Sequence, residues 1–169
     1  MKNENMYDVM IAGAGPAGLT AAIYLARACY RVLVVEKEKI GGQITITEEV
    51  VNYPGIEKTD GKSLTAAMYR QAKNFGAEFL MAEVEKLDVD GEYKIVHTNK
   101  GDFSCYGILL ATGAHPRMIG FEGEKRFKGR GVAYCATCDG EFFTGKEIFV
   151  VGGGYVQHGI PVGSPVGDR

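Results

Sequence analysis

The chain has 169 residues, of which 46% are apolar, 24% are charged and 24 residues are glycine. This content excludes a disordered tail, a collagen-like repeat and a coiled coil, although glycine is about twice as frequent as its usual ~7%. A formal net charge of −2 gives no basic excess for contact with a phosphate backbone, so we expect no nucleic-acid partner.

The N-terminal region shows no pattern typical of targeting or membrane insertion. Its first apolar run, residues 9–14, is too short for a signal peptide or a membrane span. We therefore expect a cytoplasmic protein with no membrane contact. In that reducing compartment, the four cysteines favour catalytic or buried thiols over a disulfide framework.

The first elements along the chain predict a βαβ unit. Residues 7–12 are typical of a buried strand, residues 19–29 of a helix, and residues 31–35 of a second buried strand. Two apolar strands around a helix indicate a parallel sheet with helices on its faces. The predicted fold class is therefore α/β, with a Rossmann-like three-layer domain.

The following elements predict an antiparallel addition to that sheet. After a loop at residues 39–55, an amphipathic helix is predicted at residues 62–75. Short strands follow, separated by turn residues, so this stretch is predicted to form a small antiparallel β-meander. Residues 122–131 are typical of a surface loop or linker. The predicted strands are residues 78–81, 84–89, 93–98, 102–106, 108–111 and, beyond the linker, 147–151.

A glycine motif, GxGxxG, lies between the first strand and the first helix. Gly13 permits the tight turn, Gly15 lets the backbone approach a pyrophosphate, and Gly18 lets the helix pack close to the strand. The helix N-terminus offers free N–H groups, and Pro16 suits its first position. Glu36 ends the second strand, where an acid binds a ribose and repels a 2′-phosphate. The motif predicts FAD or NAD rather than NADP, with a ligand-free turn as the alternative.

A pair of cysteines, Cys135 and Cys138, has the CxxC spacing of a redox motif and is followed by Asp139. A helix start at Cys138 would favour its thiolate, and Asp139 could exchange protons with a leaving thiolate. Half of a zinc site and a structural cysteine pair are the alternatives. We expect no metal, because a closed zinc site needs four ligands and no second close pair exists. The other possible zinc ligands are Cys29, Cys105, His97, His115 and His158. The two cysteines are interpreted as small buried residues.

Together these motifs resemble the flavin-dependent thioredoxin reductases of the low-molecular-weight, bacterial type. The resemblance covers about residues 6–154, and its matching stretches follow the order and spacing of that family. The CATCDG segment is specific, whereas the glycine motif is shared with many oxidoreductases. The matching stretches are residues 13–18, 41–43, 52–55, 111–114, 127–132 and 135–140.

The resemblance implies FAD as the cofactor. The pyrophosphate loop would contain Gly13, Gly15, Pro16, Ala17 and Gly18. Glu36 would bind the adenosine ribose, and Val84 matches the position whose backbone meets the adenine. The segments that wrap the ribityl chain and flavin ring would include Gly42, Gln43 and Asn52, and those along the cofactor Thr112 and Gly113.

The resemblance also implies the path of the electrons. In such enzymes NADPH reduces FAD, FAD reduces the disulfide, and the resulting dithiol reduces thioredoxin. Cys135 and Cys138 match the redox pair, and Asp139 matches the proton donor. A thioredoxin-like partner and a homodimer are therefore expected.

After Gly154 the sequence departs from the family pattern. The family's second nucleotide motif continues as Gly-x-Gly-x-x-Ala and a long helix, whereas Gln157 takes the third small position here, and residues 158–161 break any helix. Basic residues for the NADP 2′-phosphate have no counterpart. We predict an N-terminal piece of an FAD domain at residues 1–115. A linker with the CxxC segment and the first strand of an incomplete NADPH-type domain follows at 116–154, and an irregular, non-native or disordered tail at 155–169.

Three functional hypotheses follow from this organisation. The first is a truncated thioredoxin reductase, with FAD and CxxC, that does not use NADPH efficiently. The second is a flavin disulfide reductase fed by ferredoxin or linked to a peroxiredoxin. The third is a non-catalytic FAD-binding fragment. The tail has three possible explanations, which are a truncated or frame-shifted product, an engineered fragment and a natural short protein. The abrupt change after Gly154 favours the first of them.

Overall fold

The computed structural model describes residues 5–115, 117–135 and 140–151. The chain divides into two compact units, Met1–Ala114 and His115–Arg169.

The first unit is built on a six-stranded sheet with strand order β3-β2-β1-β6-β5-β4. Parallel pairing joins β1 (Met6–Ala12) to β2 (Val32–Glu36) and to β6 (Gly101–Leu110), and joins β2 to β3 (Glu78–Met81). Antiparallel pairing joins β4 (Val84–Asp88) to β5 (Lys94–Thr98) and β5 to β6. The predicted α/β class, with a parallel sheet and an antiparallel meander, is confirmed.

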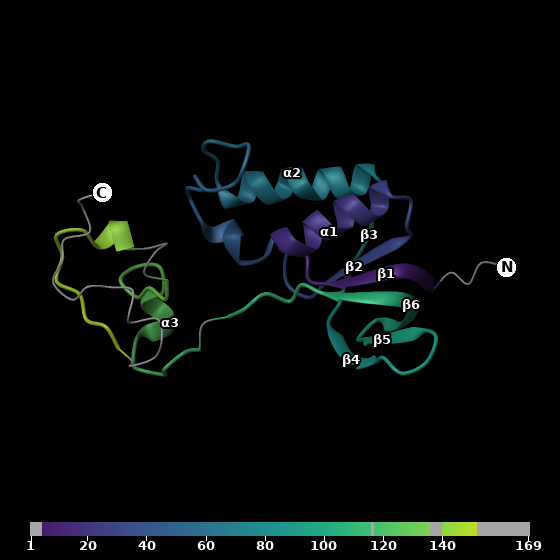
Figure 1. Cartoon of the computed structure of the whole chain (residues 1–169). Helices are drawn as coiled ribbons and strands as arrows, with labels where there is room; N and C mark the ends of the chain where they lie inside the picture. The colour runs from purple at the N-terminus through teal and green to yellow at the C-terminus, as the bar shows by residue number, and fades with distance from the viewer. Residues whose placement is uncertain (1–4, 116, 136–139, 152–169) are drawn as a thin grey trace. The chain divides into compact units, whose positions relative to one another are not determined.

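Two helices cover one face of the parallel strands, and β4 and β5 lie on the other side (Figure 1). These helices are α1 (Pro16–Arg27) and α2 (Gly61–Asn74), and a short 3₁₀ helix, η1 (Gly42–Ile46), lies in the loop between β2 and α2. The Asp60 side chain caps α2 by accepting a hydrogen bond from the Ser63 N–H (2.8 Å).

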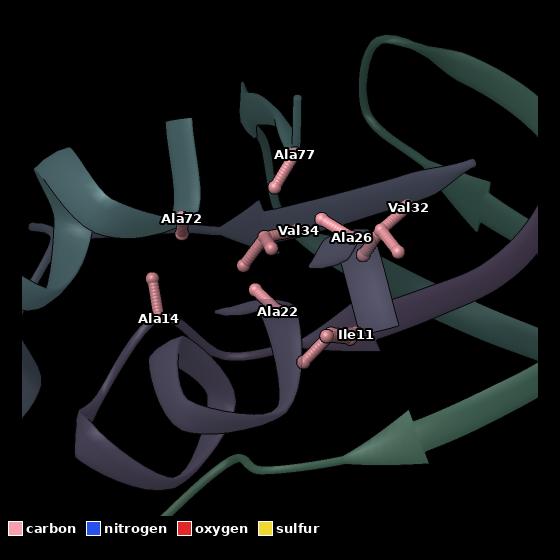
Figure 2. Close-up of a cluster of buried hydrophobic side chains, with 8 residues drawn as sticks. All are labelled: Ile11, Ala14, Ala22, Ala26, Val32, Val34, Ala72 and Ala77. Atoms are coloured by element: carbon pink, nitrogen blue, oxygen red, sulfur yellow. The ribbon is translucent and has the colours of Figure 1, made fainter. Parts of the chain in front are cut away.

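Alternate residues of β2 supply two different core layers, as the strand period of two requires. Val32 and Val34 belong to a helix-side cluster shown in Figure 2, in which alanines allow close packing of the helices. Leu33 and Val35 belong to the cluster on the meander side, with Val96 and Cys105 among its buried members. The full helix-side cluster is Ile11, Ala14, Ala22, Ala26, Val32, Val34, Ala72 and Ala77.

The strand β6 differs from its prediction as two separate strands. Gly107 pairs with Val9 of β1, so the ladder runs through the glycine without a turn. Residues 101–105 of β6 pair with β5, and residues 104–110 pair with β1. One long strand therefore joins the meander to the parallel sheet.

The second unit contains α3 (Glu124–Phe127) and a short 3₁₀ helix, η2 (Gly140–Phe143). The prediction of a surface loop at residues 122–131 was incomplete, since α3 lies there and Glu124 is only 2% exposed. The predicted buried strand at residues 147–151 is wrong. This segment is irregular and Phe149 is 88% exposed, because no strand in the described part of the chain pairs with it.

A histidine bridges the three strands of the meander. His97 of β5 contacts Asp88 of β4 through Nε2 (2.8 Å) and Asp102 of β6 through Nδ1 (3.0 Å). Hydrogen bonds to Asp88 and then Asp102 raise the pKa of His97 above its ordinary value. The protonated imidazole can donate to both carboxylates at once, so it holds the three strands in register.

This bridge predicts a pH-dependent stability. Because the folded-state pKa of His97 is raised, the contribution of His97 to the stability of the fold is complete below the unfolded pKa of about 6.5. This contribution is lost as the pH rises through the folded-state pKa. At pH values below 6, we therefore expect His97→Gln to lower the urea midpoint of the first unit, and at pH 9 we expect a much smaller decrease. A deficit of equal size at both pH values would contradict this assignment.

Candidate functional site

The site predicted for a dinucleotide lies at the carboxyl edge of the parallel strands. The loop from Gly13 to Gly15 connects the end of β1 to the start of α1, and β1 lies between β2 and β6 in the sheet. The chain turns to β2 on one side of β1 and returns as β6 on the other. This is a topological switch point, the place where open α/β sheets bind ligands.

Close backbone contacts hold this loop in place. Gly13 has a φ of +106°, and a side chain there would collide with the Ala111 carbonyl after β6. A side chain at Gly18 would collide with the Gly13 carbonyl, so α1 packs directly on the loop. The Gly13 N–H donates to the Val35 carbonyl (2.8 Å), which ties the loop to the end of β2.

Gly15 differs from its neighbours because a Cβ atom there would meet nothing within 4 Å. It is the N-cap of α1 and provides no side-chain acceptor, and Pro16 follows it in the first turn. The first-turn N–H groups have no intrahelical acceptor and lie at the positive end of the helix dipole. Open backbone beside free donors fits the pyrophosphate of a dinucleotide.

Glu36 lies beside this loop at the end of β2. Its Oε2 accepts a hydrogen bond from the Ala14 N–H (2.8 Å), and its Oε1 accepts one from the Glu38 N–H (2.9 Å). An ionised carboxylate has about four lone-pair positions, so acceptor capacity is left for the hydroxyl groups of a ribose. The carboxylate therefore orients the loop and is available to a ligand at the same time.

The start of η1 closes against the same loop. Gly42 has a φ of +65°, and a Cβ atom there would lie 3.1 Å from the Gly15 Cα. The Gly41 N–H donates to the Ala14 carbonyl (2.8 Å), and the Gln43 amide donates to the Ala114 carbonyl. The structure thus brings Gly42 and Gln43 together with the loop after β1 and the segment after β6.

Three further predicted cofactor residues lie near this edge, and the Thr112 Cα lies 3.3 Å from the point where a Cβ atom on Gly13 would stand. Thr112 and Gly113 are exposed in the segment after β6. Val84 begins β4, shortly after Ala82, whose N–H donates to the Glu36 carbonyl (2.9 Å). These positions border the edge where a long ligand would extend.

Asn52 is exposed in the loop between η1 and α2. Among the described residues, no hydrogen bond joins its side chain to the other predicted cofactor residues. Its role toward a cofactor stays a prediction, as does that of the whole set.

The cysteines fall into different environments. Cys135, in the second unit, is half-buried and forms a disulfide, whereas Cys138 and Asp139 lie outside the described residues. Cys105 is buried in β6, as predicted, and its burial raises the pKa of the thiol. The prediction that Cys29 is buried is wrong, because it occupies an exposed left-handed turn (φ 66°) after α1.

Sequence reasoning missed the buried Glu124, because a glutamate in a charged segment carries no pattern that distinguishes it from a solvated one. Its carboxylate accepts hydrogen bonds from the Tyr134 hydroxyl (2.6 Å), the Gly120 N–H (2.6 Å) and the Ile119 N–H (3.0 Å). The Tyr134 hydrogen bond is the main cause that lowers the pKa of Glu124, and the same bond raises the pKa of Tyr134.

Within residues 5–115, 117–135 and 140–151, no group of three His, Cys, Asp or Glu side chains is arranged to hold a metal ion. No helix in that part of the chain is both long and apolar enough to span a membrane.

Relatives of known sequence place these features in a family. The chain is 49% identical over 152 residues to a thioredoxin reductase of Peptoclostridium acidaminophilum, covering 89% of this chain and 48% of that protein. It therefore spans about half the length of the curated relatives it matches.

The solved structures that match this chain include further thioredoxin reductases. The fold matches a thioredoxin reductase of Streptococcus pyogenes MGAS5005 with a TM-score of 0.76 and 40% identity, over 84% of this chain and 46% of that one. It also matches a ferredoxin-flavin thioredoxin reductase of Clostridium acetobutylicum, with a TM-score of 0.60 and 31% identity, over 83% and 49% of the two chains.

A sequence model described as pyridine nucleotide-disulphide oxidoreductase matches residues 7–157, most of the chain. The matched range contains the glycine loop, Glu36 and the CxxC motif. The chain belongs to the pyridine nucleotide-disulphide oxidoreductase family and, within it, is a relative of the thioredoxin reductases.

Proposed function

We propose that this chain binds FAD at the edge formed by β1, β2 and β6 and exchanges electrons between FAD and the Cys135–Cys138 disulfide. The observation that carries the proposal is the loop from Gly13 to Gly18, which leaves open backbone at Gly15 and lies beside a carboxylate, Glu36. When bound, FAD supplies two-electron chemistry of the kind that disulfide reduction requires.

Different residues around the loop bind different parts of the cofactor. The N–H groups in the first turn of α1 bind the pyrophosphate, with Gly18 and Gly13 keeping the helix close enough to reach it. Glu36 accepts hydrogen bonds from the ribose hydroxyls and excludes a 2′-phosphate by charge repulsion. Gly42 and Gln43 border the cofactor on the η1 side.

The cysteines carry the electrons to an external disulfide. Two electrons break the Cys135–Cys138 bond, and two protons complete the dithiol, with Asp139 as the proposed donor to the leaving thiolate. The dithiol then attacks a substrate disulfide, forms a mixed disulfide and is itself reoxidised as the substrate dithiol leaves. We propose thioredoxin as this substrate, supported by the relatives named thioredoxin reductase. We also propose a homodimer as the assembly, as the family resemblance of the sequence implies.

We propose further that the 169-residue chain accepts electrons from NADPH only inefficiently. Support comes from the sequence after Gly154, where Gln157 and Pro161 replace the residues of the family's second nucleotide motif. A ferredoxin-fed reductase is the second candidate, supported by the match to the ferredoxin-flavin thioredoxin reductase of Clostridium acetobutylicum.

Removal of the Glu36 charge should weaken FAD binding. A hydrogen bond to a charged group contributes about 1.5–3 kcal/mol, so we expect Glu36→Gln to raise the dissociation constant of FAD about tenfold. Titration with FAD, followed by quenching of flavin fluorescence, measures this. The matched control is Glu38→Gln, because Glu38 contacts Glu36 only through its backbone N–H. Equal affinities for Glu36→Gln and Glu38→Gln would argue against the site.

The electron donor can be identified from the flavin absorbance under anaerobic conditions. We expect dithionite to bleach the flavin of the reconstituted chain and NADPH to leave it largely oxidised. Rapid bleaching by NADPH would contradict the proposal on the donor. Bleaching by reduced ferredoxin would favour the second candidate, and a chain that takes up no FAD would contradict both.

A further inference from the structure

The second unit contains a buried carboxylate that the proposed function does not use. Glu124 is only 2% exposed, although glutamate is rarely buried without partners. Its two oxygens accept hydrogen bonds from the Ile119 N–H, the Gly120 N–H and the Tyr134 hydroxyl. These three donors compensate the buried charge of the carboxylate. Through them, Glu124 connects the start of the unit to the residue that precedes Cys135.

The segment between these two points is itself hydrogen-bonded. The N–H groups of Arg130 and Val132 both donate to the Phe127 carbonyl (2.8 and 2.9 Å), and the Gly129 N–H donates to the Val132 carbonyl (3.0 Å). This turn follows α3 directly. The chain therefore leaves α3, forms the turn and returns to Glu124 through the Tyr134 hydroxyl.

We propose that Glu124 is a positioning residue for the redox cysteine: through its hydrogen bond with Tyr134 it fixes the backbone that presents Cys135. The inference rests on the proposed function, because it takes the disulfide of Cys135 as the group that is reduced. Tyr134 is adjacent to Cys135 in the chain, so a constraint on its side chain is passed to the cysteine through a single peptide bond.

The donor set explains why a carboxylate is needed. An ionised carboxylate only accepts hydrogen bonds, whereas a glutamine would turn an NH₂ group toward one of the three donors. Hydrogen bonds to an ionised group are also shorter and roughly twice as strong as neutral ones. The Glu124–Tyr134 bond is therefore strong enough to select one arrangement of residues 134 and 135.

A purely structural anchor is the competing explanation. It would stabilise the second unit without changing the chemistry of Cys135. The two explanations differ in their effect on the equilibrium between disulfide and dithiol. A general anchor would stabilise the two forms equally and would leave their ratio unchanged. That equilibrium is therefore the property to measure.

The test uses the full chain and the variants Tyr134→Phe and Glu124→Asp. Tyr134→Phe removes one hydroxyl and leaves both backbone bonds of Glu124 intact, whereas Glu124→Asp keeps the charge and shortens its reach. Tyr24→Phe is the matched control, since Tyr24 is exposed on α1 in the first unit. Urea unfolding establishes that each variant is folded.

The readout is exchange with dithiothreitol. Its thiolate attacks one protein sulfur, its second thiol then breaks the mixed disulfide, and the reagent leaves as a cyclic disulfide while the protein gains two electrons and two protons. Acid quenching, alkylation and mass spectrometry of the Cys135 peptide give the exchange rate and the dithiol fraction at equilibrium.

We expect Tyr134→Phe to increase the exchange rate and the equilibrium ratio of dithiol to disulfide roughly three- to tenfold. Glu124→Asp should change both in the same direction by a smaller factor, and Tyr24→Phe should change neither. An unchanged ratio in whichever of the two test variants folds, or an equal change in Tyr24→Phe, would overturn the proposal. The exchange with dithiothreitol needs no FAD. Failure of the chain to bind FAD would therefore contradict the proposed function, while the exchange experiment would still test the role of Glu124.

Discussion

The close approach of α1 to the end of β1 is the constraint on which the rest of the first unit depends. No side chain fits at Gly18 without colliding with the Gly13 carbonyl, and none fits at Gly13 without colliding with the Ala111 carbonyl. These contacts place the helix directly over the strand end and lock the loop between β2 and β6. As a result, the free N–H groups of α1, the Glu36 carboxylate and the start of η1 meet at one edge of the sheet.

Much of this arrangement could be predicted from the sequence because it depends on local patterns. The glycine spacing, the apolar strands and the acid at the end of β2 each have a short-range physical meaning, and they agree with one another. The errors arose where distant partners decide the outcome. Gly107 continues β6 because Val9 pairs with it, and residues 147–151 form no strand because none of the described strands pairs with them. Likewise, Glu124 is buried by three donors that composition cannot identify.

The two units carry different parts of the proposed chemistry. The first provides the edge for the cofactor, and its meander adds the core layer behind β1 and β2. The second carries Cys135, and Glu124 supplies the internal contact that orients the preceding tyrosine. The chain covers about half the length of its thioredoxin reductase relatives.

The central claim is that the loop from Gly13 to Gly18 binds the pyrophosphate of a dinucleotide. The most direct measurement compares the affinities of the chain for FAD and for riboflavin, which has the same flavin ring but no pyrophosphate or adenosine. If the helix N-terminus and Glu36 supply the binding energy, FAD should bind at least about a hundredfold more tightly, since several charge-assisted hydrogen bonds are lost with riboflavin. Equal affinities for the two flavins would contradict the account.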